Sequence, residues 1–179
     1  GVEPIELLQN NPYLAAEESL EVGETIVISY IIDEEPLGDI IVNGYAYTFI
    51  DNIVLRQTLP FLTYLLIFTY GFTAEGDLVP DENDDELIAT ANEFGVGPIM
   101  VLAPMTPEGN FNSEIAHELF INPVAQNTLI QNILATLDEK GYVGIDIDFE
   151  FVLPEDEDAF VNFIQNIKNS LEPAGYIVM

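Results

Sequence analysis

Three acidic side chains alternate along one apolar segment of the sequence. Asp146, Asp148 and Glu150 lie within residues 144–151, and apolar residues separate them. If this segment is a β-strand, alternate side chains share one face, and the three carboxyl groups lie about 6.6 Å apart along it. Neighbouring carboxylates repel one another and resist burial, which favours the protonated form of at least one. A carboxylic acid that stays protonated at neutral pH can serve as the general acid of glycosidic bond cleavage.

Two other interpretations of these acids stay open. A half-exposed antiparallel strand with a polar outer face gives the same alternation. Carboxylates also bind hard metal ions, but no histidine or further acid is clearly placed to complete a metal shell, so we expect no metal and no other cofactor. The flanking sequence favours the catalytic interpretation, because a strand between two amphipathic helices is normally covered on both faces.

The elements that must position the acids alternate between strand and helix from Tyr45 onward. We expect strands at 44–47, 62–72, 97–103, 142–151 and 176–179, and helices at 84–94, 122–141 and 155–171. This alternation predicts an α/β fold with a parallel sheet. The spacing matches a (β/α)8 TIM barrel, in which inward acids face the site at the carboxyl ends of the strands; only about half of the roughly 250 residues of a full barrel follow Tyr45. An open doubly wound sheet has similar spacing, but no glycine-rich phosphate loop follows the first strand.

The first residues have a different pattern. Residues 1–30 predict a short helix at 5–8 and a strand at 24–29 after a turn at Gly23, which cannot bury much core alone. Residues 31–43 are expected to be a linker, and residues 44–179 the first half of the barrel. From its abrupt start and its end within a fifth strand, we expect the chain to be truncated, with residues removed before Gly1.

Composition excludes several classes of partner. The formal net charge is −29, with only 3 lysines and arginines, so neither nucleic acid nor an anionic membrane is an expected partner. Without cysteine, disulfides, thiolate metal sites and cysteine nucleophiles are excluded. No window has the features of a signal peptide, and the apolar run 61–68 is too short to span a bilayer, so we expect a soluble protein.

The run GIDIDFE resembles the DxDxE signature of glycoside hydrolase family 18, the chitinase-like enzymes. The resemblance extends through GYAYTF, VLRQTLPFLTYLLIFTYGF, EGDLVP, PIMVLAP and residues 122–151, and so covers most of residues 42–179. These segments are similar to the spore germination branch of that family, the cortical-fragment-lytic N-acetylglucosaminidases. Residues 2–29 resemble the second helix and last strand of a LysM glycan-binding module, which implies a partial module before the barrel.

The resemblance implies a role for each acid. Glu150 would protonate the glycosidic oxygen and then activate water. Asp148 would orient the substrate N-acetyl group, which acts as the nucleophile, and Asp146 would tune Asp148. Val143 departs from the family pattern, which usually has Asp or Asn just before the glycine.

Other residues are candidates for binding the sugar chain or for packing inside the barrel. They lie at or near the ends of the first three strands and are Tyr45, Tyr47, Phe68, Tyr70 and Met100; for Met100 packing is favoured. His117, the only histidine, is expected in a helix with a surface or packing role.

The expected function is therefore cleavage of β-linked N-acetylglucosamine in peptidoglycan or chitin oligomers, at the spore coat, at the cell wall or outside the cell. The alternative is a non-catalytic glycan-binding or wall-anchoring protein of the same fold. An incomplete barrel also exposes strand edges, which predicts self-association and little activity for this chain alone.

Overall fold

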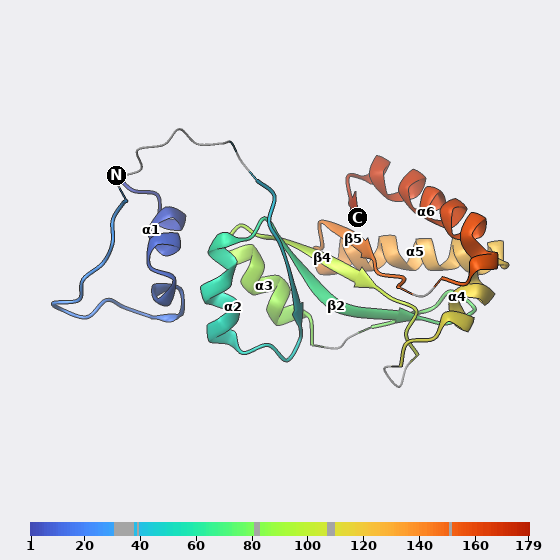
Figure 1. The fold of residues 1–179 in the computed structure, drawn as a ribbon, viewed down its shortest axis with the longest axis horizontal. Helices are drawn as coiled ribbons and strands as arrows, with labels where there is room; N and C mark the ends of the chain where they lie inside the picture. Colours follow the sequence, from blue (N-terminus) through green and yellow to red (C-terminus); the bar gives the residue numbers. More distant parts are fainter. Residues whose placement is uncertain (31–37, 39, 81–82, 107–109, 151) are drawn as a thin grey trace.

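A parallel sheet with helices on one face organises the chain. The computed structural model describes residues 1–30, 38, 40–80, 83–106, 110–150 and 152–179. Within these residues the parallel strands lie side by side in the order β1 (Asn43–Tyr47), β2 (Tyr64–Phe72), β4 (Gly97–Leu102), β5 (Gly144–Ile147) and β6 (Ile177–Val178) (Figure 1). A short strand, β3 (Leu78–Val79), pairs antiparallel with the end of β2.

Helices connect successive strands. They are α2 (Asn52–Thr58), α3 (Asp85–Glu93), α4 (Ser113–Phe120), α5 (Pro123–Lys140) and α6 (Glu157–Leu171), with short 3-10 helices η2 (Leu59–Phe61), η3 (Pro154–Asp156) and η4 (Glu172–Ala174). The expected strand–helix alternation is confirmed, and α2 and β3 are additions to it. Such an arrangement is part of a (β/α)8 barrel. Of the helices in the described residues, none is long and apolar enough to cross a membrane.

The two faces of the sheet carry different clusters. Leu65, Ile67 and Met100 belong to the large core beneath the helices. Leu66, Ile99 and Val101 form a small cluster on the opposite face, and the apolar side chains packed against it in the described part of the chain lie in or beside the strands. We call this second side the helix-free face, because the described helices pack on the other one.

Helix α5 has the ends that its sequence predicts. The Asn122 side chain accepts hydrogen bonds from the backbone N–H groups of Val124 and Ala125, and Pro123 occupies the first helical position. Lys140 lies in the last turn, where a cation interacts favourably with the helix dipole, and Gly141 closes the helix at φ +80°. These ends fix where β5 begins.

Strand β2 contains a β-bulge that changes which side chains face the core. Ile67 pairs with Met100, whereas Tyr70 pairs with Leu102, so three residue steps on β2 match two on β4. Ile67 and Tyr70 therefore both point to the helices, although residues three positions apart on a regular strand would point to opposite faces. Phe68 lies within the bulged stretch between Ile67 and Tyr70 and packs on the helix-free face.

Strand β5 is shorter than expected. It ends at Ile147, opposite Leu102, the last residue of β4. Asp148 still donates its backbone N–H to the carbonyl oxygen of Leu102 at 2.9 Å, but the neighbouring strand offers no ladder beyond that point. The expected end of the strand, residue 151, lies outside the described residues.

The N-terminal segment forms helices α1 (Pro4–Asn10) and η1 (Pro12–Ala16) but not the strand expected at 24–29. Asn11, which is buried, instead holds Val27 through two side-chain hydrogen bonds of 2.7 Å, and no second strand is present there to complete a ladder. The segment also contacts the sheet domain: Gln9 donates to the carbonyl oxygen of Pro60, and Arg56 donates to that of Ala15. Most of the expected linker (31–37 and 39) lies outside the described residues.

Candidate active site

The three acids come together at the carboxyl end of β5. Asp146 lies within the strand, paired with Val101, and Asp148 and Glu150 follow after the strand ends. Asp146 and Asp148 are half-buried and Glu150 is exposed. The predicted strand is therefore confirmed for the first acid, while chain beyond the end of the strand carries the other two.

Asp148 has the perturbed acidity that the sequence predicted for at least one of the three. Burial raises the pKa of Asp148 above its ordinary value of 3.8, and the negative charges of Glu150 and Asp146 raise it further. This shift favours a proton on Asp148 at a higher pH than an isolated aspartate would keep one. A neutral carboxyl group can donate a hydrogen bond, which a carboxylate cannot.

Tyr45 reaches the acids from the other end of the sheet. Its hydroxyl group donates a hydrogen bond of 2.9 Å to Oδ2 of Asp146, although β2 and β4 lie between their strands. Burial first, then the hydrogen bond to Asp146 and the charges of Asp146 and Asp148, together raise the pKa of Tyr45 to about 12. Tyr45 therefore stays a protonated donor at any physiological pH.

Aromatic rings extend from Tyr45 along the same face. The Phe68 ring lies 5.4 Å from that of Tyr45 and 5.2 Å from that of Tyr47, between centroids. Tyr47 is stacked in turn on Phe49, whose side chain is 81% exposed. Tyr45, Tyr47 and Phe68 thus share one surface with the acids, as a sugar-binding role requires. Phe49 was missed by the sequence analysis, although it stands in the same GYAYTF segment.

Two of the candidate binding residues lie elsewhere. Tyr70 is 1% exposed and Met100 is 0% exposed, both in the core beneath the helices. The bulge in β2 explains the position of Tyr70, because it turns this side chain away from the face that Phe68 occupies. For Met100 the structure agrees with the favoured expectation of packing, and for Tyr70 it decides between binding and packing in favour of packing.

The hydroxyl group of Tyr70 belongs to a buried polar cluster. Tyr70 and Tyr142 each donate a 2.7 Å hydrogen bond to Oδ2 of Asp84, and Lys140 bonds the other oxygen. Asp84 is fully buried and precedes α3, but its side chain caps no helical N–H. Burial lowers the pKa of Lys140, but the hydrogen bonds that Lys140 donates to Asp84 and Asp85, together with their charges, outweigh it, so the net shift is upward.

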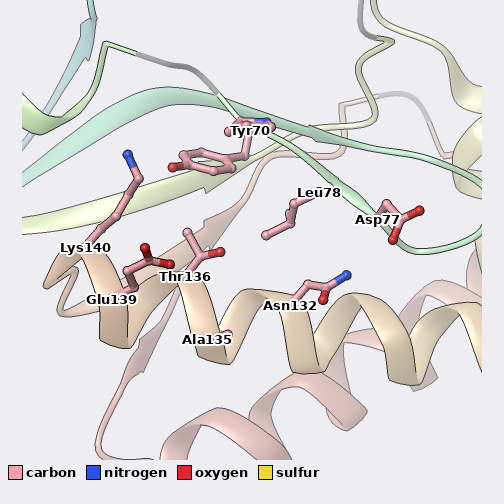
Figure 2. A pocket seen from close by; sticks show the side chains of 9 residues that line it. Tyr70, Asp77, Leu78, Asn132, Ala135, Thr136, Glu139 and Lys140 are labelled. Carbon is pink, nitrogen blue, oxygen red and sulfur yellow. The ribbon is translucent and has the colours of Figure 1, made fainter.

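A cavity of about 440 Å³ lies beside this cluster, between β3 and α5. Figure 2 shows Tyr70 and Lys140 at one end of it and Asp77 at the other, with Leu78, Thr136 and Asn132 between them. Tyr70 belongs to the core beneath the helices, so this cavity lies on the opposite side of the sheet from the Tyr45–Asp146 contact. We therefore place the candidate site at the acids rather than in the cavity.

Phe149, between the last two acids in sequence, anchors them to the core. Its ring is stacked on those of Phe72 and Phe160 at 5.4 and 5.8 Å, and contacts Phe120 and Phe163. Because side chains of neighbouring residues tend to point to opposite sides, burying Phe149 in the core beneath the helices directs Asp148 and Glu150 away from that core. Val143, the departure from the family pattern, packs with the apolar cluster of the helix-free face, one residue before β5 begins.

His117 has a specific partner that the sequence did not indicate. Its Nδ1 atom lies 2.8 and 2.9 Å from the two carboxylate oxygens of Asp156. The expected helix around His117 is confirmed as α4. Among the described residues, no group of three or more acids, histidines or cysteines has the geometry to hold a metal ion.

The fold and the acids define this chain as part of a (β/α)8 barrel with an acidic site at the carboxyl ends of its strands. It is 31% identical over 143 residues to the cortical fragment-lytic enzyme of Bacillus anthracis, matching 75% of this chain and 33% of the relative. The crystal structure of the Bacillus cereus spore cortex-lytic enzyme SleL superposes with a TM-score of 0.70 at 29% identity, covering 77% of this chain and 33% of that one.

A chitinase from Chromobacterium violaceum shares the fold, with a TM-score of 0.69 at 22% identity over 77% of this chain and 44% of that one. No family model matches the chain. The chain spans about a third of the length of the curated relatives that it matches at 31% identity.

Proposed function

We propose that this chain carries the acid catalyst of a glycoside hydrolase that cleaves β-linked N-acetylglucosamine in peptidoglycan, with spore cortex fragments as the substrate and chitin oligomers as substitutes. The row of Asp146, Asp148 and Glu150 on an aromatic-lined surface carries this proposal. The names of the cortical fragment-lytic and spore cortex-lytic relatives support the choice of glycan. A spore or cell-wall location follows from the same substrate.

The proposed mechanism is substrate-assisted and retains configuration. Glu150, the most exposed of the three acids, protonates the leaving glycosidic oxygen. Asp148 accepts a hydrogen bond from the N–H of the N-acetyl group, so it orients the carbonyl oxygen that attacks the anomeric carbon and stabilises the oxazolinium ion formed. Asp146, which accepts a hydrogen bond from Tyr45, tunes Asp148. Glu150 then takes a proton from the water that opens the ring intermediate.

Two further parts of the proposal concern the chain as a whole. Residues 1–30 are the later part of a LysM glycan-binding module, and residues 44–179 are the first half of the barrel. The helix-free face and the strand edges of such a half associate with a second copy when no further strands cover them.

Mass spectrometry of peptidoglycan and chitin-oligomer digests tests the function. The chain is compared with a version extended to the length of its relatives, and with Glu150→Gln in that version. We expect new N-acetylglucosamine ends from the extended protein, none from Glu150→Gln, and unchanged cleavage by the control Glu155→Gln, which alters an exposed acid of η3. Cleavage by Glu150→Gln would overturn the assignment. Glycan binding without cleavage by the extended protein would establish the non-catalytic alternative.

A further inference from the structure

Helix α4 holds the acid-bearing segment from the side opposite the candidate site. His117 and Phe120 are three residues apart on α4 and so lie on one face of it. Phe120 contacts the ring of Phe149 at 6.1 Å, next to Asp148 and Glu150 in sequence. His117 contacts Asp156, the residue at which η3 ends and α6 begins. Figure 1 shows α4 beside the start of α6.

The contact between His117 and Asp156 is close and involves a buried carboxylate. Asp156 is 4% exposed, and both of its carboxylate oxygens lie within 2.9 Å of His117 Nδ1. A buried carboxylate without a donor would be strongly unfavourable, so the imidazole fixes where Asp156 can lie. The His117 side chain is itself 39% exposed, and replacing it does not open the core.

The segment between β5 and α6 needs such an anchor. After Ile147 the sheet ladder ends, and among the described residues of the segment the last backbone hydrogen bond to the sheet is that of Asp148 to Leu102. Phe149 fixes the beginning of the segment in the phenylalanine cluster. Its other end is fixed where η3 begins α6, and there the Asp156 side chain is held by His117.

We propose that His117 is a positioning residue: by holding Asp156 it fixes the far end of the segment that carries Glu150, and thereby the position of the carboxyl group that protonates the glycosidic oxygen. This inference rests on the proposed role of Glu150. A misplacement of about 1 Å in a catalytic group costs as much as 100-fold in rate, so the His117–Asp156 contact influences turnover without touching the substrate.

A pair of substitutions at position 117 tests the geometry directly. The side-chain nitrogen of Asn overlays Nδ1 of histidine, whereas that of Gln overlays Nε2. His117→Asn therefore keeps a donor toward Asp156, and His117→Gln moves it away. In the version extended to the length of its relatives, we expect His117→Gln and Asp156→Ala to lower kcat by about 10-fold with KM within about twofold. We expect His117→Asn to keep most of the activity.

Hydrogen exchange supplies a readout that does not depend on turnover. We expect faster amide exchange in the peptides that contain residues 148–150 and 152–156 in His117→Gln, and unchanged exchange in α5. Slow exchange in that segment together with full activity of His117→Gln would overturn the positioning role, as would equal losses in the Asn and Gln variants. A wild-type protein that cleaves no glycan would instead overturn the proposed function, and with it the catalytic role of the His117–Asp156 contact.

Discussion

The hydroxyl group of Tyr45 on β1 donates a 2.9 Å hydrogen bond to Oδ2 of Asp146 on β5, across the two strands that separate them. This bond joins the first and the fourth parallel strand on the helix-free face. It also supplies Asp146 with a donor that keeps its proton, because the pKa of Tyr45 is raised to about 12. The partner of Asp146 is thus a neutral hydroxyl group rather than a cation.

Removing that hydroxyl group should weaken catalysis without unfolding the protein. In Tyr45→Phe, Asp146 loses a hydrogen bond to a charged group, worth about 1.5–3 kcal/mol. We expect kcat/KM on glycan oligomers to fall by about 10-fold or more, measured in the cleaving protein. Tyr13→Phe, which removes an exposed hydroxyl group in the N-terminal segment, is the matched control and should change nothing. Equal activities of the two variants would show that the bond across the sheet has no catalytic part.

Asp148 should make stability depend on pH in a defined direction. Its folded-state pKa is raised, so the native protein binds more protons than the unfolded chain between the ordinary value of 3.8 and the raised one. The charged carboxylate therefore destabilises the folded state above that window, and the penalty disappears as pH falls through it. We expect Asp148→Asn to raise the melting temperature at pH 7 and to lose this advantage near pH 4.

Thermal scans from pH 4 to pH 8 measure this difference. Asp158→Asn, which also removes one negative charge but at an exposed position in the first turn of α6, is the control for net charge. A gain for Asp148→Asn that is the same at every pH would contradict the raised pKa.

The buried cluster around Asp84 should contribute strongly to stability. Asp84→Ala leaves two tyrosine hydroxyl groups and Lys140 without their shared acceptor. Breaking a buried ion pair by removing one partner costs about 3–5 kcal/mol. Urea unfolding should show a loss of about this size. Asp85→Asn, at an 80% exposed side chain that also contacts Lys140, should cost less than about 1 kcal/mol. Similar losses for the two variants would disprove the special position of Asp84.

Phe68 and Met100 should separate binding from packing. Phe68→Ala removes a ring between Tyr45 and Tyr47, so we expect a higher KM for glycan oligomers. Met100→Ala empties a fully buried site and should cost about 2–5 kcal/mol of unfolding free energy, with KM unchanged at a temperature where the variant is folded. An increase in KM for Met100→Ala larger than that for Phe68→Ala would reverse the assignment.

The sequence predicted best those features that depend on local chemistry. The helix expected at 122–141 is confirmed as α5, because its Asn122 cap and its end at Gly141 depend on residues within the helix itself. The strand that carries Asp146 was likewise visible from its alternation. The strand expected at 24–29 is absent because strand formation needs a partner, and Asn11 supplies two hydrogen bonds to Val27 instead.

Features that depend on pairing between distant segments could not be predicted. Asp84 lies just before α3, where an aspartate side chain commonly caps a helix, but it caps none here. Its side chain turns to Tyr70, Tyr142 and Lys140, which converge on it only in the folded chain. The contact of His117 with Asp156 is of the same kind, because 39 residues separate the two. The catalytic roles of the three acids stay predictions.

The bulge in β2 allows one strand to serve two surfaces in turn. Leu66 and Phe68 belong to the side that the acids occupy, and after a single extra residue Tyr70 and Phe72 belong to the core. If every residue of β2 paired regularly, strict alternation would place Tyr70 and Phe72 on the side of the acids, and the hydrogen bond from Tyr70 to Asp84 would be lost. The extra residue therefore lets the first half of β2 line the acidic face while its second half supplies the buried cluster around Asp84.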